Sequence, residues 1–388
     1  MRTDESVTGQ VAPFRVEVSP TMAVAILVPQ DRIPRPPLGT WAARLCRMLD
    51  TARATRTTRQ LAGQLGSIGN QAGLLAAHAG DVSRAWHVTE QQLWWQGRLA
   101  RRSHDPTVTA HAVQPWVNLG RLEALTGRWR EALARLAALS AYEMDDWLEL
   151  GCMRLRGSDY LGVSASREHF VGFLQAVYVS DSLKTMLLNR RFDLIHPFAA
   201  SARAEGPLWW MCEEASVVAE CRLGDYPAAM SRADTAAREA TGWSRAALRL
   251  RLAEAHACAG DLNRARAILS QLAAVVRQLS PEVKAKPELM PITARLAGAC
   301  HEVGLADDAC AVARDVLQGA RTANDEMIEI EMLKLLADAS PEHETQAWRD
   351  ATDAAVAVTD YARFRRGAPP RPNPVFDELY ERLEAVYT

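Results

Sequence analysis

The chain has 388 residues, of which 48% are hydrophobic and 24% are charged, so it carries enough apolar side chain to bury a large core. Its 45 basic and 47 acidic residues give a formal charge of −2. No global field therefore favours nucleic acid or an anionic membrane, and we expect direct binding to neither.

Cysteine usage and the N-terminus predict a cytoplasmic protein. The seven cysteines are odd in number and contain no Cys-x-x-Cys pair, which is typical of reduced thiols. Asp4 and Glu5 stand where a signal peptide would be basic, and the apolar run at 22–28 ends at Pro29 without a cleavage box. Lysine occurs only at positions 184, 284, 286 and 334, and this arginine-rich, alanine-rich composition fits a high-GC bacterial genome.

The first 37 residues differ from the rest of the chain. Phe14, Val16 and Val18 alternate with polar neighbours, and a proline-rich stretch follows the apolar run. This pattern predicts a short extended or β N-terminal arm over residues 1–37. From Trp41 onward, apolar residues recur at helical spacing instead.

Five later segments share one pattern around a predicted turn. In each, a glycine is followed five residues later by an alanine, namely Gly80/Ala85, Gly127/Ala132, Gly224/Ala229, Gly260/Ala265 and Gly304/Ala309. Glycine tolerates the positive φ at which one helix ends, and alanine lets the second helix pack closely on the first. The pattern therefore predicts consecutive antiparallel helix pairs.

These segments resemble the tetratricopeptide repeat, whose period is about 34 residues. The copy that matches best contains Trp116, Leu119, Gly120, Gly127, Trp129, Ala132 and Leu136. The resemblance covers residues 58–320 with a gap between 139 and 224, in which residues 189–192 could form one more turn. It implies an all-α fold, a right-handed α-solenoid of antiparallel helix pairs.

The chain is thus divided into the arm 1–37, a helical repeat domain 38–367, and a linker with a C-terminal helix over 368–388. Residues 142–173 fit no repeat and predict an irregular insertion. Asn373 can cap the last helix, which carries one apolar stripe of Phe376, Leu379, Tyr380, Leu383 and Tyr387. We expect this helix to cover an exposed apolar end of the solenoid.

The resemblance implies that the first helix of each pair lines a concave groove. Counting back from the turns, the candidate ligand-binding residues are Asn70, His78, Gln114, Arg121, Glu214, Arg222, Glu254, His301 and Glu302. Their mixed charge suits a peptide, a protein partner or a small anionic ligand, with Arg121 and Arg222 holding an anionic group. The alternative is an ordinary solvated helix face.

Two further features have a structural and a functional interpretation. Trp94–Trp95 and Trp209–Trp210 could each place one ring at an interface, but burial of both rings between helical layers is the preferred interpretation. Cys221, His256, Cys258, Cys300 and His301 recur at related repeat positions as potential metal ligands. Neighbouring first helices lie about 10 Å apart, which is too far for shared ligation, so we predict no metal and no cofactor.

These observations predict a cytosolic bacterial binding, scaffold or ligand-sensing protein that holds its ligand in a concave helical groove. The oligomeric state stays open. The alternative is an enzyme of specialised metabolism, with its site between the 142–173 insertion and the groove. The chain shows no nucleophile elbow, His-Glu-x-x-His motif or Ser-His-Asp order that would identify a chemistry.

Overall fold

The computed structural model describes residues 38–53, 58–103, 113–141, 167–201, 209–284, 289–323, 325–358 and 373–388. Within these ranges 89% of the residues are helical, in 17 α-helices and one short 3-10 helix, and no strand is present. The predicted all-α fold is confirmed for this part of the chain. The predicted N-terminal arm, residues 1–37, lies outside it.

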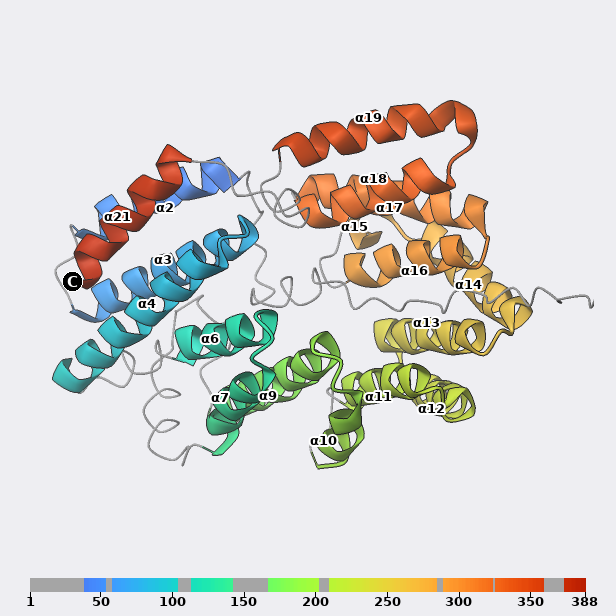
Figure 1. Ribbon diagram of the computed structural model, residues 1–388, viewed down its shortest axis with the longest axis horizontal. Coiled ribbons are helices and arrows are strands. Elements are labelled where there is room, and N and C mark those ends of the chain that lie inside the picture. Colours follow the sequence, from blue (N-terminus) through green and yellow to red (C-terminus); the bar gives the residue numbers. More distant parts are fainter. Residues whose placement is uncertain are drawn as a thin grey trace, which may run out of the picture.

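Most helices follow one another as pairs joined by short turns, as predicted, and each packs against its neighbours in succession (Figure 1). The pairs are α3 (Thr58–His78) with α4 (Val82–Ser103), α6 (Val113–Leu125) with α7 (Trp129–Ala141), α11 (Trp209–Leu223) with α12 (Tyr226–Glu239), α13 (Gly242–Cys258) with α14 (Leu262–Arg277), α16 (Met290–Glu302) with α17 (Ala306–Ala323), and α18 (Glu326–Ala339) with α19 (Glu342–Val358). The remaining elements are α2 (Leu38–Arg53), α9 (Arg167–Leu188), η1 (Phe192–Leu194), α10 (Ile195–Ser201), α15 (Pro281–Lys284) and α21 (Pro374–Tyr387).

The five predicted turn glycines share one backbone conformation. Their φ angles are 81°, 79°, 84°, 83° and 80° at positions 80, 127, 224, 260 and 304. The following residue donates its N–H to the carbonyl five positions earlier, as in Asp81 to Ala76 at 2.9 Å and Asp225 to Glu220 at 2.9 Å. This is the Schellman arrangement, which satisfies the last carbonyls of the first helix. The alanine five residues after each glycine is completely buried.

The turn expected at 189–192 is present and has the same hydrogen bonds. Arg191 donates its N–H to the Met186 carbonyl at 2.8 Å, and Arg190 occupies the glycine position with φ of 55°. The helix that follows, α10, is short and packs against α11. The helix before this turn, α9, begins at Arg167, so the last residues of the expected insertion, 142–173, are helical. Residues 142–166 lie outside the described part.

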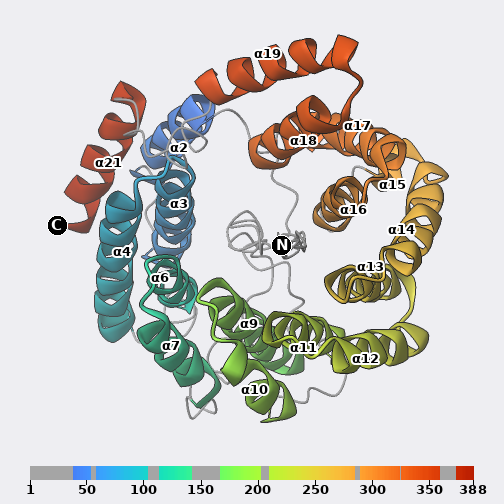
Figure 2. The same cartoon turned by 45° about the vertical axis from the view of Figure 1, so that its right-hand side comes forward.

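The helix pairs form a curved array with an inner and an outer layer of helices (Figure 2). α3, α6, α9, α11, α13 and α16 lie on the inner side, and α4, α7, α12, α14 and α17 on the outer side. The pair α18 and α19 extends the array beyond the residues that showed the repeat pattern, and it curves back toward α2. The first helices therefore form the inner surface.

The C-terminal helix α21 packs against α2, α3 and α4, so the apolar end that it covers is the N-terminal one (Figure 1). Asn373 Oδ1 accepts a hydrogen bond from the Val375 N–H at 3.1 Å, as its predicted capping role requires. All five residues of the predicted stripe are buried. Two of them also donate hydrogen bonds to α3, Tyr380 Oη to the Ala72 carbonyl at 3.1 Å and Tyr387 Oη to the Leu65 carbonyl at 3.2 Å.

No helix in the described ranges combines the length and the apolar character that crossing a bilayer would need.

Candidate ligand-binding site on the inner face

The inner helices carry polar side chains at recurring distances from their turns. These residues stand six, nine or ten positions before the turn residue, and we call them the polar row. They are Asn70 on α3, Asn118 and Arg121 on α6, Asp181 and Lys184 on α9, Glu214 on α11, Arg251 and Glu254 on α13, and Arg295 on α16. Residues three apart lie on one helix face, so the spacing aligns the row from helix to helix.

In the N-terminal half, the polar row connects α3, α6 and α9. Asn118 Nδ2 donates to Asn70 Oδ1, and Gln114 Nε2 donates to Asn118 Oδ1 at 3.1 Å. The Arg121 guanidinium contacts Asp181 Oδ2 through Nε at 3.0 Å and Nη2 at 2.9 Å. The Asp181 side chain is only 5% exposed and that of Arg121 12%. Arg121 thus has an internal carboxylate partner.

Lys184 adds a second cation beside the Arg121–Asp181 pair. Its Nζ donates to Ser180 Oγ and lies 3.7 Å from Asp181 Oδ1. Burial lowers the pKa of Lys184 to about 8, while the Asp181 carboxylate acts in the opposite direction and Arg121 adds to the lowering. This amine is therefore poised to lose its proton more readily than an exposed lysine.

In the C-terminal half, the polar row connects α11, α13 and α16. Arg251 donates from Nε to Glu214 Oε1 at 2.8 Å and from Nη1 to Glu254 Oε2 at 3.1 Å. Arg295 adds a bond from Nη2 to Glu254 Oε2 at 2.6 Å. Burial raises the pKa of the Glu254 carboxyl above its usual range, and the Arg251 guanidinium opposes that shift. The central residues Arg251 and Glu254 are both buried.

The structure therefore brings five of the predicted groove residues into two hydrogen-bonded sets. Asn70, Gln114 and Arg121 belong to the set in the N-terminal half, and Glu214 and Glu254 to the set in the C-terminal half. Arg222, His301 and Glu302 lie closer to the turns. Arg222 and Glu302 are exposed and His301 is half-buried. His78 belongs to α3, but its side chain is outside what the structure describes.

Near the turns, Arg222, Cys258 and Glu302 occupy the same position, two before the glycine, in three consecutive pairs. The Cys258 thiol is hydrogen-bonded to Cys221, and this bond, together with Arg222, lowers the pKa of Cys258 against the effect of burial. The same bond and burial raise the pKa of Cys221. Cys258 is the half-buried member of the six free cysteines that the structure describes, and the others are buried.

The recurring His and Cys residues do not assemble a metal site in the described ranges, where no group of three or more His, Cys, Asp or Glu side chains could hold an ion. His256 Nδ1 lies 3.2 Å from Asp261 Oδ2. Cys300 is fully buried, and burial raises its pKa to about 12. His256 thus lies beside a carboxylate of its own turn, and Cys300 is part of the hydrophobic core.

The tryptophan pairs behave differently from each other. Trp94 is 51% exposed, with the Arg98 guanidinium 4.5 Å from its ring centroid, whereas Trp95 packs 5.6 Å from the Tyr387 ring. The preferred interpretation, burial of both rings, is wrong for this pair because the two side chains diverge by about 100° around the helix. Trp209 and Trp210 both pack in the apolar cluster that contains Leu248.

No protein-family model matches the chain, and no curated protein is significantly similar to it in sequence. The resemblance to tetratricopeptide repeats accordingly rests on the turn pattern and on the succession of helix pairs.

Proposed function

We propose that the protein is a tetratricopeptide-like, right-handed α-solenoid of the bacterial cytoplasm that binds a carboxylate-bearing peptide or small ligand on its inner face, as a scaffold or ligand sensor. The observation that supports this proposal best is the polar row, which runs along the inner helices from α3 to α16.

The stability of the array does not by itself require the charged residues of the polar row. Removing a charge from water costs several kcal/mol, and a well-packed apolar pair is often as stabilising as a buried ion pair. A repeat array that had only to fold could use apolar contacts between its inner helices. We infer that the charges are retained because they present oriented polar groups at the inner surface.

The partly exposed cations of the polar row are the groups best suited to bind an anionic ligand. The side chains of Arg121, Lys184 and Arg295 are 12%, 17% and 17% exposed, so each keeps some access to solvent while its partner fixes its position. Arg222 is exposed nearer the turn. Fixed guanidinium groups bind carboxylates through paired hydrogen bonds with little loss of side-chain entropy.

The test is to identify a ligand by native mass spectrometry of the purified protein and to titrate it against alanine variants. Arg222→Ala should weaken binding by about 1.5–3 kcal/mol, the contribution of a charge-assisted hydrogen bond, with an unchanged melting temperature. Arg121→Ala should weaken binding and also lower the melting temperature, because it leaves Asp181 buried without its guanidinium.

The matched control is Arg349→Ala, because Arg349 is exposed on α19 in the outer layer. It should bind the ligand as the wild type does. If Arg222→Ala and Arg349→Ala had equal affinity, the inner face near α11 would not be the site. The alternative, an enzyme with its site between the 142–173 insertion and the groove, would then be preferred.

A further inference from the structure

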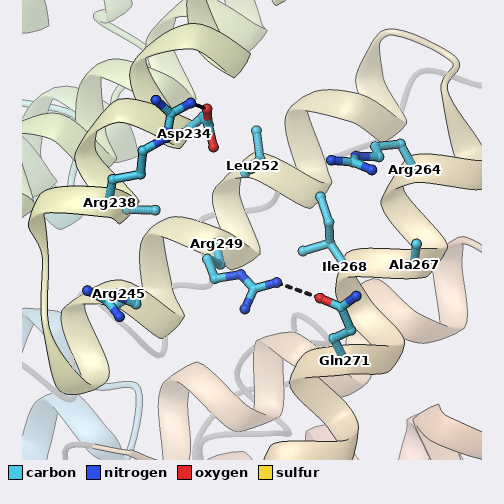
Figure 3. A pocket seen from close by; sticks show the side chains of 10 residues that line it. Asp234, Arg238, Arg245, Arg249, Leu252, Arg264, Ala267, Ile268 and Gln271 are labelled. Atoms are coloured by element: carbon cyan, nitrogen blue, oxygen red, sulfur yellow. Dashed lines mark hydrogen bonds and ion pairs between the residues drawn. The ribbon is translucent and has the colours of Figure 1, made fainter.

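A pocket of about 490 Å³ lies between α12, α13 and α14, and none of its lining residues belongs to the polar row (Figure 3). This volume is within the range of about 300–1,000 Å³ that is usual for small-molecule sites. Its lining comes from two consecutive helix pairs: Asp234, Ala237 and Arg238 on α12, Arg245, Arg249 and Leu252 on α13, and Arg264, Ala267, Ile268 and Gln271 on α14. The glycine and alanine pattern of the sequence did not indicate this pocket, because the pocket forms only where the two helix pairs meet.

The pocket lining is strongly basic. It contains four arginines and a single carboxylate, Asp234, which forms an ion pair with Arg238. Arg249 Nη2 donates to the neutral amide of Gln271 at 2.7 Å, and Arg245 Nε donates to a backbone carbonyl, that of Ala240, at 2.7 Å. Among the lining residues no carboxylate remains for Arg245, Arg249 and Arg264, in a chain whose formal charge is only −2.

This basic character is particular to the pocket and does not follow from the repeat. Arg264 stands four residues after its turn glycine. The equivalent residue of the first pair, Arg84, forms an ion pair with Asp377 at 2.9 Å. In the next pair the equivalent is an acid, Asp308, which contacts Arg277 at 3.1 Å. The repeat position thus accepts either charge, and in these two pairs an ion pair neutralises it.

Apolar side chains form the other part of the lining. Ile268 is 6% exposed and Ala237 7%, and Leu252 is half-buried beside them. Figure 3 shows Arg249 and Arg264 extending toward the pocket from α13 and α14, with Ile268 between them. A ligand held here would meet cations at the rim and an apolar surface beneath them.

We propose that this pocket binds a small organic diphosphate. Each phosphate oxygen accepts hydrogen bonds, and a guanidinium binds phosphate through two parallel N–H groups. A diphosphate monoester carries about three negative charges, which matches the three guanidinium groups without a carboxylate partner in the lining. The apolar surface gives the organic part of the ligand a place to pack. This proposal is independent of the inner-face function.

The experiment is isothermal titration calorimetry of the whole protein with adenosine diphosphate as the probe, compared with pyrophosphate, adenosine monophosphate, citrate and a phosphopeptide. Adenosine diphosphate should bind more tightly than the monophosphate and citrate, and its affinity should fall as salt is added. The Arg249→Gln/Arg264→Gln double variant should bind it at least about tenfold more weakly. Arg349→Gln, with an exposed arginine on α19, should bind as the wild type does.

A second measurement does not depend on the folding of a variant. In the wild-type chain, adenosine diphosphate should slow modification of Arg249 and Arg264 by phenylglyoxal, mapped by mass spectrometry, and leave the rate at Arg349 unchanged. The proposal is overturned if no diphosphate binds at millimolar concentration, or if the double variant retains wild-type affinity. Tighter binding of a phosphopeptide than of either diphosphate would also overturn it, because the ligand would then be a partner protein.

Discussion

Residue 190 has the least favourable backbone conformation among the described turns. Five turns use glycine at this position with φ near 80°, but the sixth uses Arg190 with φ of 55°. The left-handed region brings Cβ close to the following carbonyl, which costs roughly 1–2 kcal/mol for a residue with a side chain. Arg190 is exposed, so its side chain gains no compensating burial.

Arg190→Gly should therefore stabilise the protein, by about 0.5–1 kcal/mol after the greater flexibility of glycine in the unfolded chain is subtracted. The reverse test is Gly127→Ala, because nothing lies within 4 Å of the added Cβ and only the φ of 79° opposes it. That change should cost about 1 kcal/mol. Urea denaturation measures both, and a stabilised Gly127→Ala variant would contradict the conformational explanation.

Lys184 predicts a pH dependence of stability with a definite sign. Its pKa is about 8 in the folded protein against 10.5 when it is unperturbed, chiefly because of burial. Between these two values the unfolded chain binds more protons than the folded one, so this residue makes the free energy of unfolding rise with pH. Below the window both states are protonated and its contribution is constant.

The measurement compares wild type with Lys184→Met by urea denaturation at several pH values across that window. The free energy of unfolding of wild type minus that of the variant should increase with pH, and taking the difference removes the opposing contribution of the buried cysteines. A flat difference would mean that the Asp181 carboxylate, 3.7 Å away, keeps the amine at its ordinary pKa.

At the scale of the helix pair, one contact position holds an ion pair in two of the pairs and an apolar contact at the turn of Arg190. In the α6 and α7 pair, Glu123 stands four residues before the turn glycine and Arg135 eight residues after it. Arg135 donates from Nε and Nη2 to the Glu123 carboxylate, at 2.9 and 2.6 Å. The pair α11 and α12 has Glu220 and Arg232, joined at 2.8 Å. The same positions before and after the turn at Arg190 hold Met186 and Phe198, which pack in one apolar cluster.

The Glu123 side chain is 4% exposed, so its charge depends on Arg135. Arg135→Phe alone should cost about 3–5 kcal/mol, because the carboxylate stays buried without a partner. Adding Glu123→Met recreates the Met186/Phe198 contact and should bring stability back to within about 1.5 kcal/mol of wild type. Chemical denaturation of wild type, the Arg135→Phe and Glu123→Met single variants and the double variant gives the coupling between the two residues. Equal instability of the single and double variants would show that the contact is not transferable between pairs.

Features that depend on local backbone geometry could be predicted from the sequence, and those that depend on neighbouring pairs could not. The positive φ of Gly80 and the burial of Ala132 follow from one turn and its own helices. The partner of Arg121 is Asp181, which is 60 residues away on the next inner helix, so repeat counting placed the arginine but not its ion pair. The pair α18 and α19 falls within the predicted repeat domain, 38–367, but its turn was not located from the sequence because it lacks the glycine and alanine signal.

At the scale of the whole molecule, the two ends of the described chain form one unit. α21 lies on the outer side beside α4, and α2 lies on the inner side beside α3, so α21 takes the place of the second helix in a pair that begins with α2 (Figure 2). Arg382 forms an ion pair with Asp50, and Arg84 forms one with Asp377 at 2.9 Å. The N-terminal pair is thus completed by residues more than 300 positions away.

This arrangement predicts where the array opens when α21 is weakened. Leu383 is fully buried in the cluster of α2 and α3, so Leu383→Ala should cost about 2–5 kcal/mol. Hydrogen exchange followed by mass spectrometry should then become faster in α2, α3 and α4, because these are the helices that α21 contacts. Exchange in α16–α18 should stay slow. Leu333→Ala is the matched control, since Leu333 is 1% exposed in the cluster of α16–α18, and it should reverse the pattern. Faster exchange throughout the array in both variants would mean that it unfolds as a single cooperative unit, and that α21 does not hold a separate N-terminal pair.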